Sequence, residues 1–262
     1  MLKREDIRYL RDKVLEKTGI DLSYYKENQL QRRLPFIMNR AGVQSVEEYI
    51  ELLDKDPQVL EDFKNRFAIN VSEFFRNPER YEDLKNKVLP ELLKEAGLIL
   101  KVWSAGCSVG SEPYSLAMVL EEMPHRKPYR IWATDIDEDA LEKAKEGVYT
   151  EDFLHNVPAP YLAKYFQPVS GGKYAVVPQL KKRIVFEKND LLRDEAKETF
   201  SLIVCRNVII YFENEAKKMA FEKMSNALQE GGYLWIGSTE RVADPSSLGL
   251  HYVLPFFYRK GR

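Results

Sequence analysis

A loop of small residues between a predicted strand and a predicted helix is the part of this sequence best suited to chemistry. Residues 98–103 form a nearly continuous apolar run, which is typical of a strand buried on both faces of a parallel sheet. Residues 104–110 are all small except for one valine, so a ligand could approach the backbone closely. Ser111 is then a predicted N-cap, and Glu112 lies in the first turn of the helix that follows. Strand, loop and helix N-terminus together predict a cradle for a cofactor.

An acidic residue sharpens this prediction. Residues 129–134 predict the next strand, and Asp135 follows at its carboxyl end. In a βαβ unit, an acid at this place can accept hydrogen bonds from both hydroxyls of a ribose. The alternative is that Asp135 caps the helix that begins near Asp137. Because Gly106 and Gly110 are four residues apart, the loop does not carry the GxGxxG pattern of dinucleotide-binding proteins.

The segment before this strand and the ends of the later strands hold further candidates. In residues 70–76, two adjacent phenylalanines predict a packed segment, with Asn70, Ser72 and Arg76 turned the other way. Arg76 could clamp a carboxylate through its planar guanidinium, or it could be a solvent-exposed charge at the start of the next helix.

Two later strands are predicted at about residues 183–187 and 200–205. The first ends in Asn189–Asp190–Leu191–Leu192, a polar and then apolar stretch suited to the edge of an adenine. Asn207 and Tyr211 follow the second, and ligands of doubly wound sheets bind outside the carboxyl ends of the strands. As alternatives, Asn207 could form a turn and Tyr211 could belong to the core.

The elements that position these residues predict two domains and a link between them. Residues 1–68 form a domain of four short helices, and residues 69–97 form a linker and a connecting helix. Residues 98–262 alternate strands and helices as an α/β domain, with a small antiparallel β insertion at about 147–182.

Two local features of these domains carry their own expectations. Pro35 lies inside the second helix, predicted from about Tyr25 to Arg40, and should kink or split it. Near the end of the chain, residues 233–237 and 252–258 predict two strands that close the sheet as an antiparallel hairpin.

The second helix also carries four basic residues, three of which are seven positions apart and share one stripe. They are Lys26, Arg33 and Arg40, with Arg32 beside them. The stripe is either a solvated face or a docking surface for an acidic partner.

Composition limits the class of protein. The chain has 262 residues, 44% of them hydrophobic, which is enough for an α/β core and a smaller domain. A net charge of −1 and a pI near 6.4 argue against a nucleic-acid binder. The chain has no signal-like apolar segment and no run that approaches a membrane span. Its two cysteines provide neither a disulfide framework nor a metal site, so we expect a cytoplasmic protein that needs no metal.

The loose glycine loop, the acid and the antiparallel ending favour one enzyme class. A nicotinamide dehydrogenase would carry GxGxxG and parallel strands to the end. An adenosylmethionine-dependent methyltransferase has a looser loop, an acid after its second strand and an antiparallel last strand, as predicted here. A nucleic-acid amino-methyltransferase would carry an Asn/Asp-Pro-Pro-aromatic motif where Arg206–Asn207–Val208–Ile209 stand.

Five motifs, in order along nearly the whole chain, make the sequence resemble the CheR family, the chemotaxis receptor methyltransferases. They are NVSEFFR at 70–76, SAGCSVGSEPYSLAM at 104–118, ATDID at 133–137, CRNVIIYF at 205–212 and GSTE at 237–240. The resemblance implies a Rossmann-like α/β fold and transfer of a methyl group from S-adenosylmethionine to glutamate carboxylates of chemoreceptor cytoplasmic helices. The products would be glutamate methyl esters and S-adenosylhomocysteine, in bacterial chemotactic adaptation.

The resemblance also implies a set of cofactor-binding residues. They are Asn70, Ser72, Arg76, Glu112, Asp135, Asp190, Leu191, Asn207 and Val208. Ser72 stands where threonine is common in the family, and this change keeps the hydroxyl group. Asp190 stands where some members have asparagine, so the choice between Asn189 and Asp190 at the adenine stays open.

A glutamate carboxylate is ionised at neutral pH, so its methylation needs no general base, and the enzyme must mainly position the reactants. Arg76 and Tyr211 are the candidates that orient the carboxylate, although Arg76 could instead bind the carboxylate of the cofactor. The alternative function is a non-catalytic receptor-binding module that senses adenosylmethionine.

For the partner, we expect a monomer whose basic stripe binds chemoreceptor cytoplasmic domains. Some CheR members grip a peptide at the receptor's C-terminus with the antiparallel subdomain. Here the turn at 167–172 is short, so we expect no such tether.

Overall fold

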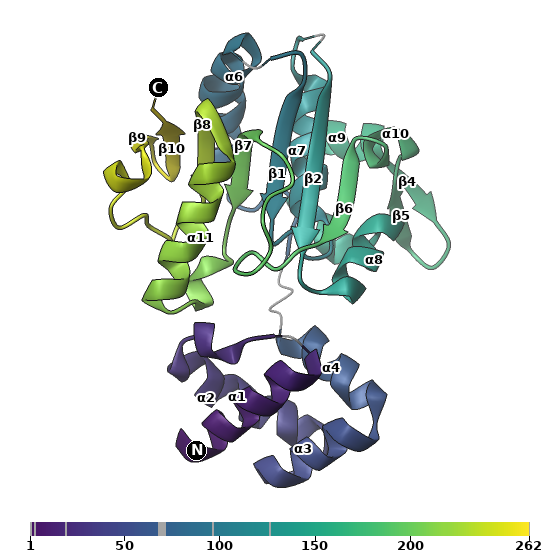
Figure 1. Cartoon of the computed structure of the whole chain (residues 1–262). Coiled ribbons are helices and arrows are strands. Elements are labelled where there is room, and N and C mark those ends of the chain that lie inside the picture. Colours follow the sequence, from purple (N-terminus) through teal and green to yellow (C-terminus); the bar gives the residue numbers. More distant parts are fainter. Residues whose placement is uncertain are drawn as a thin grey trace. The chain divides into compact units, whose positions relative to one another are not determined.

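The computed structural model describes residues 2, 4–18, 20–67, 72–95, 97–125 and 127–261 (Figure 1). The chain forms two compact units. Residues 1–70 and 210–218 make the first, called the helical unit below, and residues 71–209 and 219–262 make the second, called the sheet unit.

The helical unit contains the four helices that the apolar spacing predicts. They are α1 (Arg4–Thr18), α2 (Glu27–Arg40), α3 (Val46–Lys55) and α4 (Pro57–Phe67), with a 3₁₀ turn, η1 (Leu22–Tyr24), before α2. Leu10, Leu30 and Phe63 are fully buried between them. The hydroxyl of Ser45 caps α3 by accepting a hydrogen bond from Glu48 N at 3.1 Å. Helix α2 runs through Pro35 without being split.

A segment far along the sequence completes the helical unit. It comprises most of η4 (Ile209–Tyr211) and the start of α11 (Asn214–Ala227). Tyr25 forms an isolated antiparallel bridge with Phe212, and the two rings meet edge to face at 5.5 Å. Glu213 N donates to Tyr24 O at 2.8 Å. Neither periodicity nor composition marks residues 210–218 for this unit, because the contact depends on long-range backbone pairing.

The sheet unit is built on a seven-stranded sheet in the order β6-β2-β1-β7-β8-β10-β9. The strands are β1 (Leu100–Ala105), β2 (Tyr129–Asp135), β6 (Ile184–Lys188), β7 (Phe200–Cys205), β8 (Leu228–Ile236), β9 (Leu250–Leu254) and β10 (Phe257–Lys260). The first five strands of this order are parallel, so their carboxyl ends share one edge. The helices include α7 (Ser111–Glu122) and α8 (Glu138–Glu146). This confirms the predicted α/β fold.

The connecting helix predicted before the sheet has three parts. It consists of α5 (Pro78–Asp83), a π-helical stretch, η2 (Leu84–Val88), and α6 (Leu89–Glu95). Its apolar side chains Tyr81, Leu84 and Val88 are buried against the sheet unit's core.

The prediction of a single strand at 252–258 is wrong. Strands β9 and β10 divide that run, and Phe256 adopts a left-handed φ of 71° in the turn between them. Pro255 explains the break, because proline cannot donate to the sheet ladder and commonly ends a strand. Strand β10 pairs antiparallel with β8, which confirms the antiparallel ending, and β9 then forms the outer edge.

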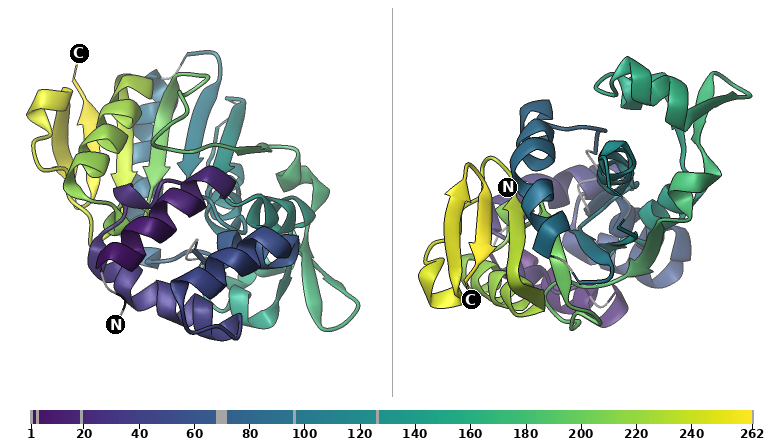
Figure 2. Two further views of the ribbon diagram at one scale, coloured as in Figure 1. Left: turned by 60° about the horizontal axis from the view of Figure 1, so that its bottom comes forward. Right: turned by 90° about the horizontal axis from the view of Figure 1, so that it is seen from above.

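The predicted insertion is a separate three-stranded antiparallel sheet. Its strands are β3 (Val148–Thr150), β4 (Phe166–Val169) and β5 (Lys173–Val176), in the order β3-β5-β4. It also holds η3 (Glu151–Leu154), α9 (Ala159–Tyr165) and α10 (Pro178–Lys181). Figures 1 and 2 show the insertion beyond the β6 edge of the large sheet, with β9 and β10 at the opposite edge.

The two predicted core phenylalanines join the insertion to the rest of the sheet unit. Phe74 is fully buried, and its ring meets those of Tyr149 at 4.9 Å and Phe166 at 5.4 Å, both edge to face. Phe75 packs on Tyr81 and Tyr161. The segment after residue 71 is therefore held by its aromatic side chains, as the sequence predicts.

Candidate cofactor site at the carboxyl edge of the sheet

The glycine loop after β1 is tied to the end of β2 by hydrogen bonds. Gly106 N and Cys107 N both donate to Thr134 O, at 2.8 and 2.9 Å. Ser108 N donates to Asp135 Oδ2 at 2.7 Å. Gly106 and Ser108 have φ values of 77° and 49°, so the loop turns sharply around the acid.

Asp135 is buried, with only 9% of its surface exposed. Burial raises the pKa of Asp135 to about 6, although hydrogen bonds from the backbone N–H groups of Asp137 and Ser108 oppose the shift. Helix α8 is capped by Asp137, whose Oδ1 accepts from Ala140 N at 3.0 Å. The alternative in which Asp135 is the helix cap is therefore wrong. Asp135 Oδ2 accepts from Ser108 N and Oδ1 from Asp137 N, at 2.7 and 3.0 Å, and carboxylate oxygens can accept further hydrogen bonds from ligand hydroxyls.

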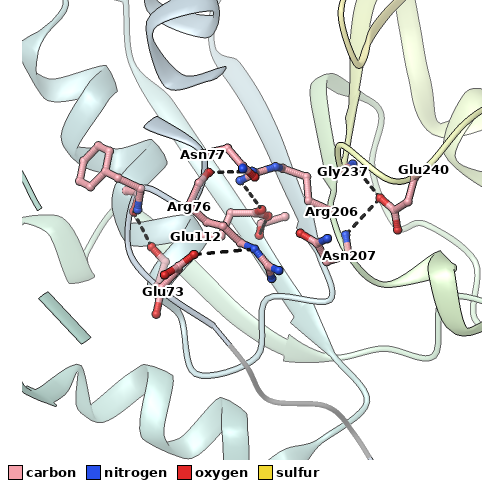
Figure 3. Close-up of polar contacts among 12 residues, drawn as sticks. Glu73, Arg76, Asn77, Glu112, Arg206, Asn207, Gly237 and Glu240 are labelled. Atoms are coloured by element: carbon pink, nitrogen blue, oxygen red, sulfur yellow. Dashed lines mark hydrogen bonds and ion pairs between the residues drawn. The ribbon is translucent and has the colours of Figure 1, made fainter. Parts of the chain in front are cut away.

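The loops after β1, β7 and β8 also form one connected structure. A β-carbon at Gly106 would lie 2.3 Å from Cγ2 of Val208, so only glycine fits this approach. Glu240 Oε2 accepts from Asn207 N at 3.1 Å and from Gly237 N at 2.6 Å. The GSTE motif thus fixes the residue that follows β7, and Figure 3 shows this carboxylate between the two loops.

Backbone strain gathers at this edge of the sheet. Among the described residues, five that are not glycine have left-handed φ values: Phe75, Asn77, Ser108, Asn207 and Phe256. All but Phe256 lie in the 72–77 segment or in the loops after β1 and β7. Such conformations cost about 1–3 kcal/mol each and cluster at functional sites.

A buried arginine lies at the centre of the site. The side chain of Arg206 is only 3% exposed. Its Nη2 donates to Arg76 O at 2.7 Å and to Asn77 Oδ1 at 2.9 Å. Its guanidinium carbon lies 4.5 Å from the centre of the Trp235 ring, which is a cation–π contact. Figure 3 shows this side chain between the 72–77 segment and the loop after β7.

Glu112 is a second acid of the site, and its side chain is 15% exposed. Its Oε1 accepts from Ser104 Oγ at 2.8 Å, and its Oε2 lies 3.6 Å from Arg206 Nη1. Burial raises the pKa of Glu112, while Arg206 and then Ser104 oppose the shift. Gly110, with φ 91°, is the N-cap of α7, so the prediction that Ser111 caps this helix is wrong by one residue. Glycine supplies the left-handed turn that a serine there would find strained.

Arg76 is more accessible than the groups behind it. Its side chain is 36% exposed, and its Nε lies 3.8 Å from Glu73 Oε1 (Figure 3). Glu73 Oε2 in turn lies 3.3 Å from both His155 Nε2 and Asn156 Nδ2, which follow η3 of the insertion. The backbone of Arg76 is therefore held by Arg206, while its side chain is partly exposed.

Two family models match this chain, one for each unit. The CheR methyltransferase SAM-binding domain matches residues 70–250, and the CheR methyltransferase all-alpha domain matches residues 5–68. The chain belongs to the CheR methyltransferase family. This confirms the resemblance on which the site residues were assigned, and it makes the sheet unit a domain that binds S-adenosylmethionine.

Similar proteins cover almost the whole chain. A chemotaxis protein methyltransferase of Listeria monocytogenes is 39% identical over 98% of this chain and 97% of its own length. One of Borreliella burgdorferi is 32% identical over 99% of this chain and 95% of its own. Among solved structures, the N-methyltransferase NodS from Bradyrhizobium japonicum in complex with S-adenosyl-L-homocysteine is 18% identical, with a TM-score of 0.36. It covers 61% of this chain and 60% of its own.

Asn189, Asp190 and Leu191, the residues predicted at the adenine, lie in a turn after β6. Asp190 Oδ1 accepts from Leu192 N at 2.9 Å, and Arg193 Nε lies 3.8 Å from its Oδ2. Asn189 N donates to Asp135 O at 3.0 Å, which brings this turn beside the β2 end. Leu191 is half-buried. The choice between Asn189 and Asp190 stays open, because the acid mainly organises its own turn.

Two other predicted cofactor residues lie in the segment before α5. Asn70 falls outside the described residues. Ser72 is half-buried, two residues before the aromatic anchors of that segment. The role of Ser72 in binding stays a prediction.

The remaining predicted residues lie in the helical unit. Tyr211 is half-buried, and its carbonyl accepts from Lys26 N at 3.0 Å. Lys26 precedes α2, and its Nζ donates to Ile210 O at 2.9 Å. Arg33 is half-buried, and burial lowers its pKa, whereas Arg32 and Arg40 are exposed. The receptor-binding role of this stripe stays a prediction.

Sequence reasoning missed two residues that organise the site, Arg206 and Glu240. Both lie in motifs that support the resemblance, CRNVIIYF and GSTE. The signal that could have found them is a charged residue next to a fully apolar strand end, where burial requires a partner.

Proposed function

We propose that this protein methylates glutamate side chains on the cytoplasmic helices of chemoreceptors, using S-adenosylmethionine, and that it acts in the cytoplasm in chemotactic adaptation. The products are a glutamate methyl ester and S-adenosylhomocysteine. The names of the relatives, chemotaxis protein methyltransferases, support the process, and the chemistry of Arg76 supports the substrate.

The two acids fit the cofactor. Asp135 offers two carboxylate oxygens to the ribose hydroxyls, and Glu112 offers a negative charge to the cationic α-amino group. Leu191, with Asn189 or Asp190, would border the adenine, and Asn207 and Val208 complete the proposed set of cofactor-binding residues. Gly106 supports this fit, because a β-carbon there would collide with Val208, one of the proposed cofactor-binding residues.

The observation that carries the proposed substrate is the placement of Arg76. Its guanidinium is one-third exposed, and its ion pair with Glu73, at 3.8 Å, is too long for a strong hydrogen bond. A planar guanidinium can hold a carboxylate with two parallel hydrogen bonds. Arg76 therefore orients the glutamate of the receptor, and the orienting role of Tyr211, which belongs to the helical unit, stays a prediction from the sequence.

The reaction asks little of the protein beyond this orientation. Bound S-adenosylmethionine supplies a methyl group on a positively charged sulfur, which is a good leaving group. A glutamate has an ordinary pKa near 4.3, so its carboxylate is ready to attack without a general base. Arg76 would hold the glutamate carboxylate so that one of its oxygens could meet the methyl group in line, which is the positioning that the reaction requires. A site that excludes water would favour this reaction, because attack on the methyl group neutralises two charges.

Transfer of a labelled methyl group tests the proposal. The protein is incubated with receptor cytoplasmic fragments and methyl-labelled S-adenosylmethionine, and the labelled receptor is then treated with alkali. A glutamate methyl ester releases volatile labelled methanol, whereas a methylated amine keeps its label. We expect release of the label, and none from fragments whose methylated glutamates are changed to alanine.

Arg76→Lys separates catalysis from binding alone. Lysine keeps the charge but cannot hold a carboxylate with two parallel hydrogen bonds, so we expect kcat to fall by about tenfold or more. Cofactor binding without any transfer to the receptor would support the non-catalytic sensor instead. Alkali-stable label on the receptor would contradict glutamate as the substrate.

A further inference from the structure

Arg206 contacts two of the predicted cofactor-binding residues and is not itself one of them. It reaches the carbonyl of Arg76 through Nη2 and the carboxylate of Glu112 through Nη1. Under the proposed function, Glu112 binds the α-amino group of the cofactor and Arg76 binds the carboxylate of the receptor glutamate. Arg206 itself is buried, so it acts on ligands through its neighbours.

We propose that Arg206 is a positioning residue that sets affinity for the amino-acid end of the cofactor by pairing with Glu112, and that it also fixes the backbone of the turn at Arg76 and Asn77. This inference rests on cofactor binding as given under the proposed function, but not on glutamate as the substrate.

The first part of the argument is electrostatic. A buried carboxylate tends to become protonated unless a cation faces it. Burial raises the pKa of Glu112, and the positive charge of Arg206 is the largest effect that lowers it, followed by the hydrogen bond from Ser104. The negative charge of Glu240 raises the pKa of Glu112, and the positive charge of Arg76 lowers it by a smaller amount than Arg206 does. The remaining titratable groups that face this acid are Tyr81, Cys107 and Cys205, whose pKa values burial raises.

The second part is geometric. Asn77 has a left-handed φ of 59°, which is strained for a residue with a side chain. Arg206 Nη2 donates to its side-chain oxygen at 2.9 Å and to the preceding carbonyl at 2.7 Å. One nitrogen thus holds two consecutive residues of the strained turn that carries Arg76.

The third part concerns why the residue is arginine. The guanidinium lies on the Trp235 ring and near Tyr81 while its nitrogens reach three separate oxygens. Lysine has a compact ammonium group that cannot stack as a plane and bridge these acceptors at once. Lysine would therefore keep the positive charge near Glu112 but lose the hold on the turn.

Two ligands separate this role from simple structural support. S-adenosylhomocysteine carries the amino-acid end, whereas methylthioadenosine has the same nucleoside without the amino and carboxyl groups. For Arg206→Gln, we expect calorimetry to show a Kd at least about tenfold higher for S-adenosylhomocysteine, as for loss of a buried ion pair. The Kd for methylthioadenosine should change less than about threefold, which also shows that the variant is folded.

Further variants separate the ion pair with Glu112 from the hold on the turn at Arg76 and Asn77. Arg206→Lys keeps the charge and should show an intermediate loss, and it serves where Arg206→Gln does not fold. In a Glu112→Gln background, Arg206→Gln should add less than it does alone, because the ion pair is already gone. Below neutral pH, the loss in Arg206→Gln should widen, because Glu112 without its cation is protonated at higher pH than in the unaltered protein.

Arg259 is a matched control outside the site. It also lies over an aromatic ring, that of Tyr233, and pairs with Glu95 at 2.8 Å. Arg259→Gln removes an arginine with a similar ring contact and ion pair, although its side chain is 30% exposed, and should change the Kd of neither ligand. Equal losses for both ligands in the Arg206 variants, or no loss, would overturn the proposal. Failure of glutamate methylation with intact, Arg206-dependent S-adenosylhomocysteine binding would overturn the proposed function alone.

Discussion

The carboxyl edge of the large sheet and the basic stripe of α2 both carry charged residues, but they hold them differently. At the sheet edge, Asp135 and Arg206 are buried and each makes several short hydrogen bonds. On α2, Arg32 and Arg40 are exposed, and Arg32 donates a hydrogen bond to Gln29 Oε1 at 2.9 Å, one turn earlier on the same helix. A buried charge is costly and fixed in direction, whereas an exposed charge is screened and mobile.

This difference indicates which kind of function each region suits. Fixed charges in a dry environment can orient a bound molecule to within a few tenths of an ångström. Exposed charges act at a distance and mainly speed the encounter with an oppositely charged partner. Loss of a buried charge should therefore change affinity strongly, and loss of an exposed charge should change it weakly.

The largest effect is expected for Asp135→Ala. It removes the proposed ribose contacts and leaves the backbone N–H groups of Ser108 and Asp137 without their acceptor. We expect binding of S-adenosylhomocysteine to weaken by about 1–3 kcal/mol, as measured by calorimetry. Asp139→Asn removes an equal charge on the exposed first turn of α8 and should leave the affinity unchanged. Unchanged affinity in a folded Asp135→Ala would sink the ribose assignment.

The next effect is on the pH dependence of cofactor binding. The pKa of Asp135 is raised to about 6 by burial. The ribose hydroxyls donate to the ionised carboxylate of Asp135. Cofactor binding therefore releases a proton from each protein molecule in which Asp135 is protonated. We expect the Kd for S-adenosylhomocysteine to be flat above about pH 7 and to rise as the pH falls through 6, by up to about tenfold per pH unit.

Methylthioadenosine sharpens this measurement, because it keeps the ribose but cannot meet Glu112. Its pH dependence should show the Asp135 step alone, whereas S-adenosylhomocysteine should show an additional contribution from Glu112. Calorimetry in buffers of different ionisation enthalpy counts the protons released. A Kd for methylthioadenosine that stays flat from pH 7.5 to 5 would show that Asp135 does not meet the ribose.

The sequence predicted the parts of this site that depend on short-range patterns. The buried strand before Ser104, the sharp loop and the acid after β2 follow from apolar runs and from residues within one βαβ unit. Prediction failed where a contact joins distant segments. The hold of Arg206 on Asn77 spans 129 positions, and the bridge of Tyr25 with Phe212 is equally invisible to periodicity.

Local errors have physical causes as well. Ser111 has the side chain of an N-cap, but Gly110 takes that position because the loop needs a left-handed residue there. The strand predicted at 252–258 is divided at Pro255. The prediction missed this turn because the residues on both sides of the proline are apolar. In each case a backbone requirement overrides the propensity of the side chains.

A smaller effect is expected from the exposed charges of α2. Changing Arg32 and Arg40 together to glutamine should raise the receptor KM about two- to fivefold at low salt and flatten its salt dependence. The Kd for S-adenosylhomocysteine should not change. Lys26 and Arg33 are better left in place in this test, because Lys26 binds the carbonyl of Ile210 and Arg33 is half-buried.

A control pair removes the same amount of charge from other surfaces of the helical unit. Lys13, 34% exposed, and Lys55, 72% exposed, lie on α1 and α3. Changing both to glutamine should have less effect on the receptor KM than the α2 pair has. If both pairs changed the receptor KM equally, the stripe would contribute only through the net charge of the protein and would not be a docking surface.

The smallest effect is expected at the insertion, where we predict no binding of a receptor C-terminal peptide. Strand β5 is already paired on both sides, so the free edges belong to β3 and β4, and the β4–β5 turn is short. A peptide added to an edge strand also needs pockets for its side chains, which a short glycine turn cannot build. Titration of receptor C-terminal peptides should therefore give a Kd no lower than about 1 mM. Micromolar binding that substitutions within 171–177 abolish would show that the protein tethers itself to its receptor after all.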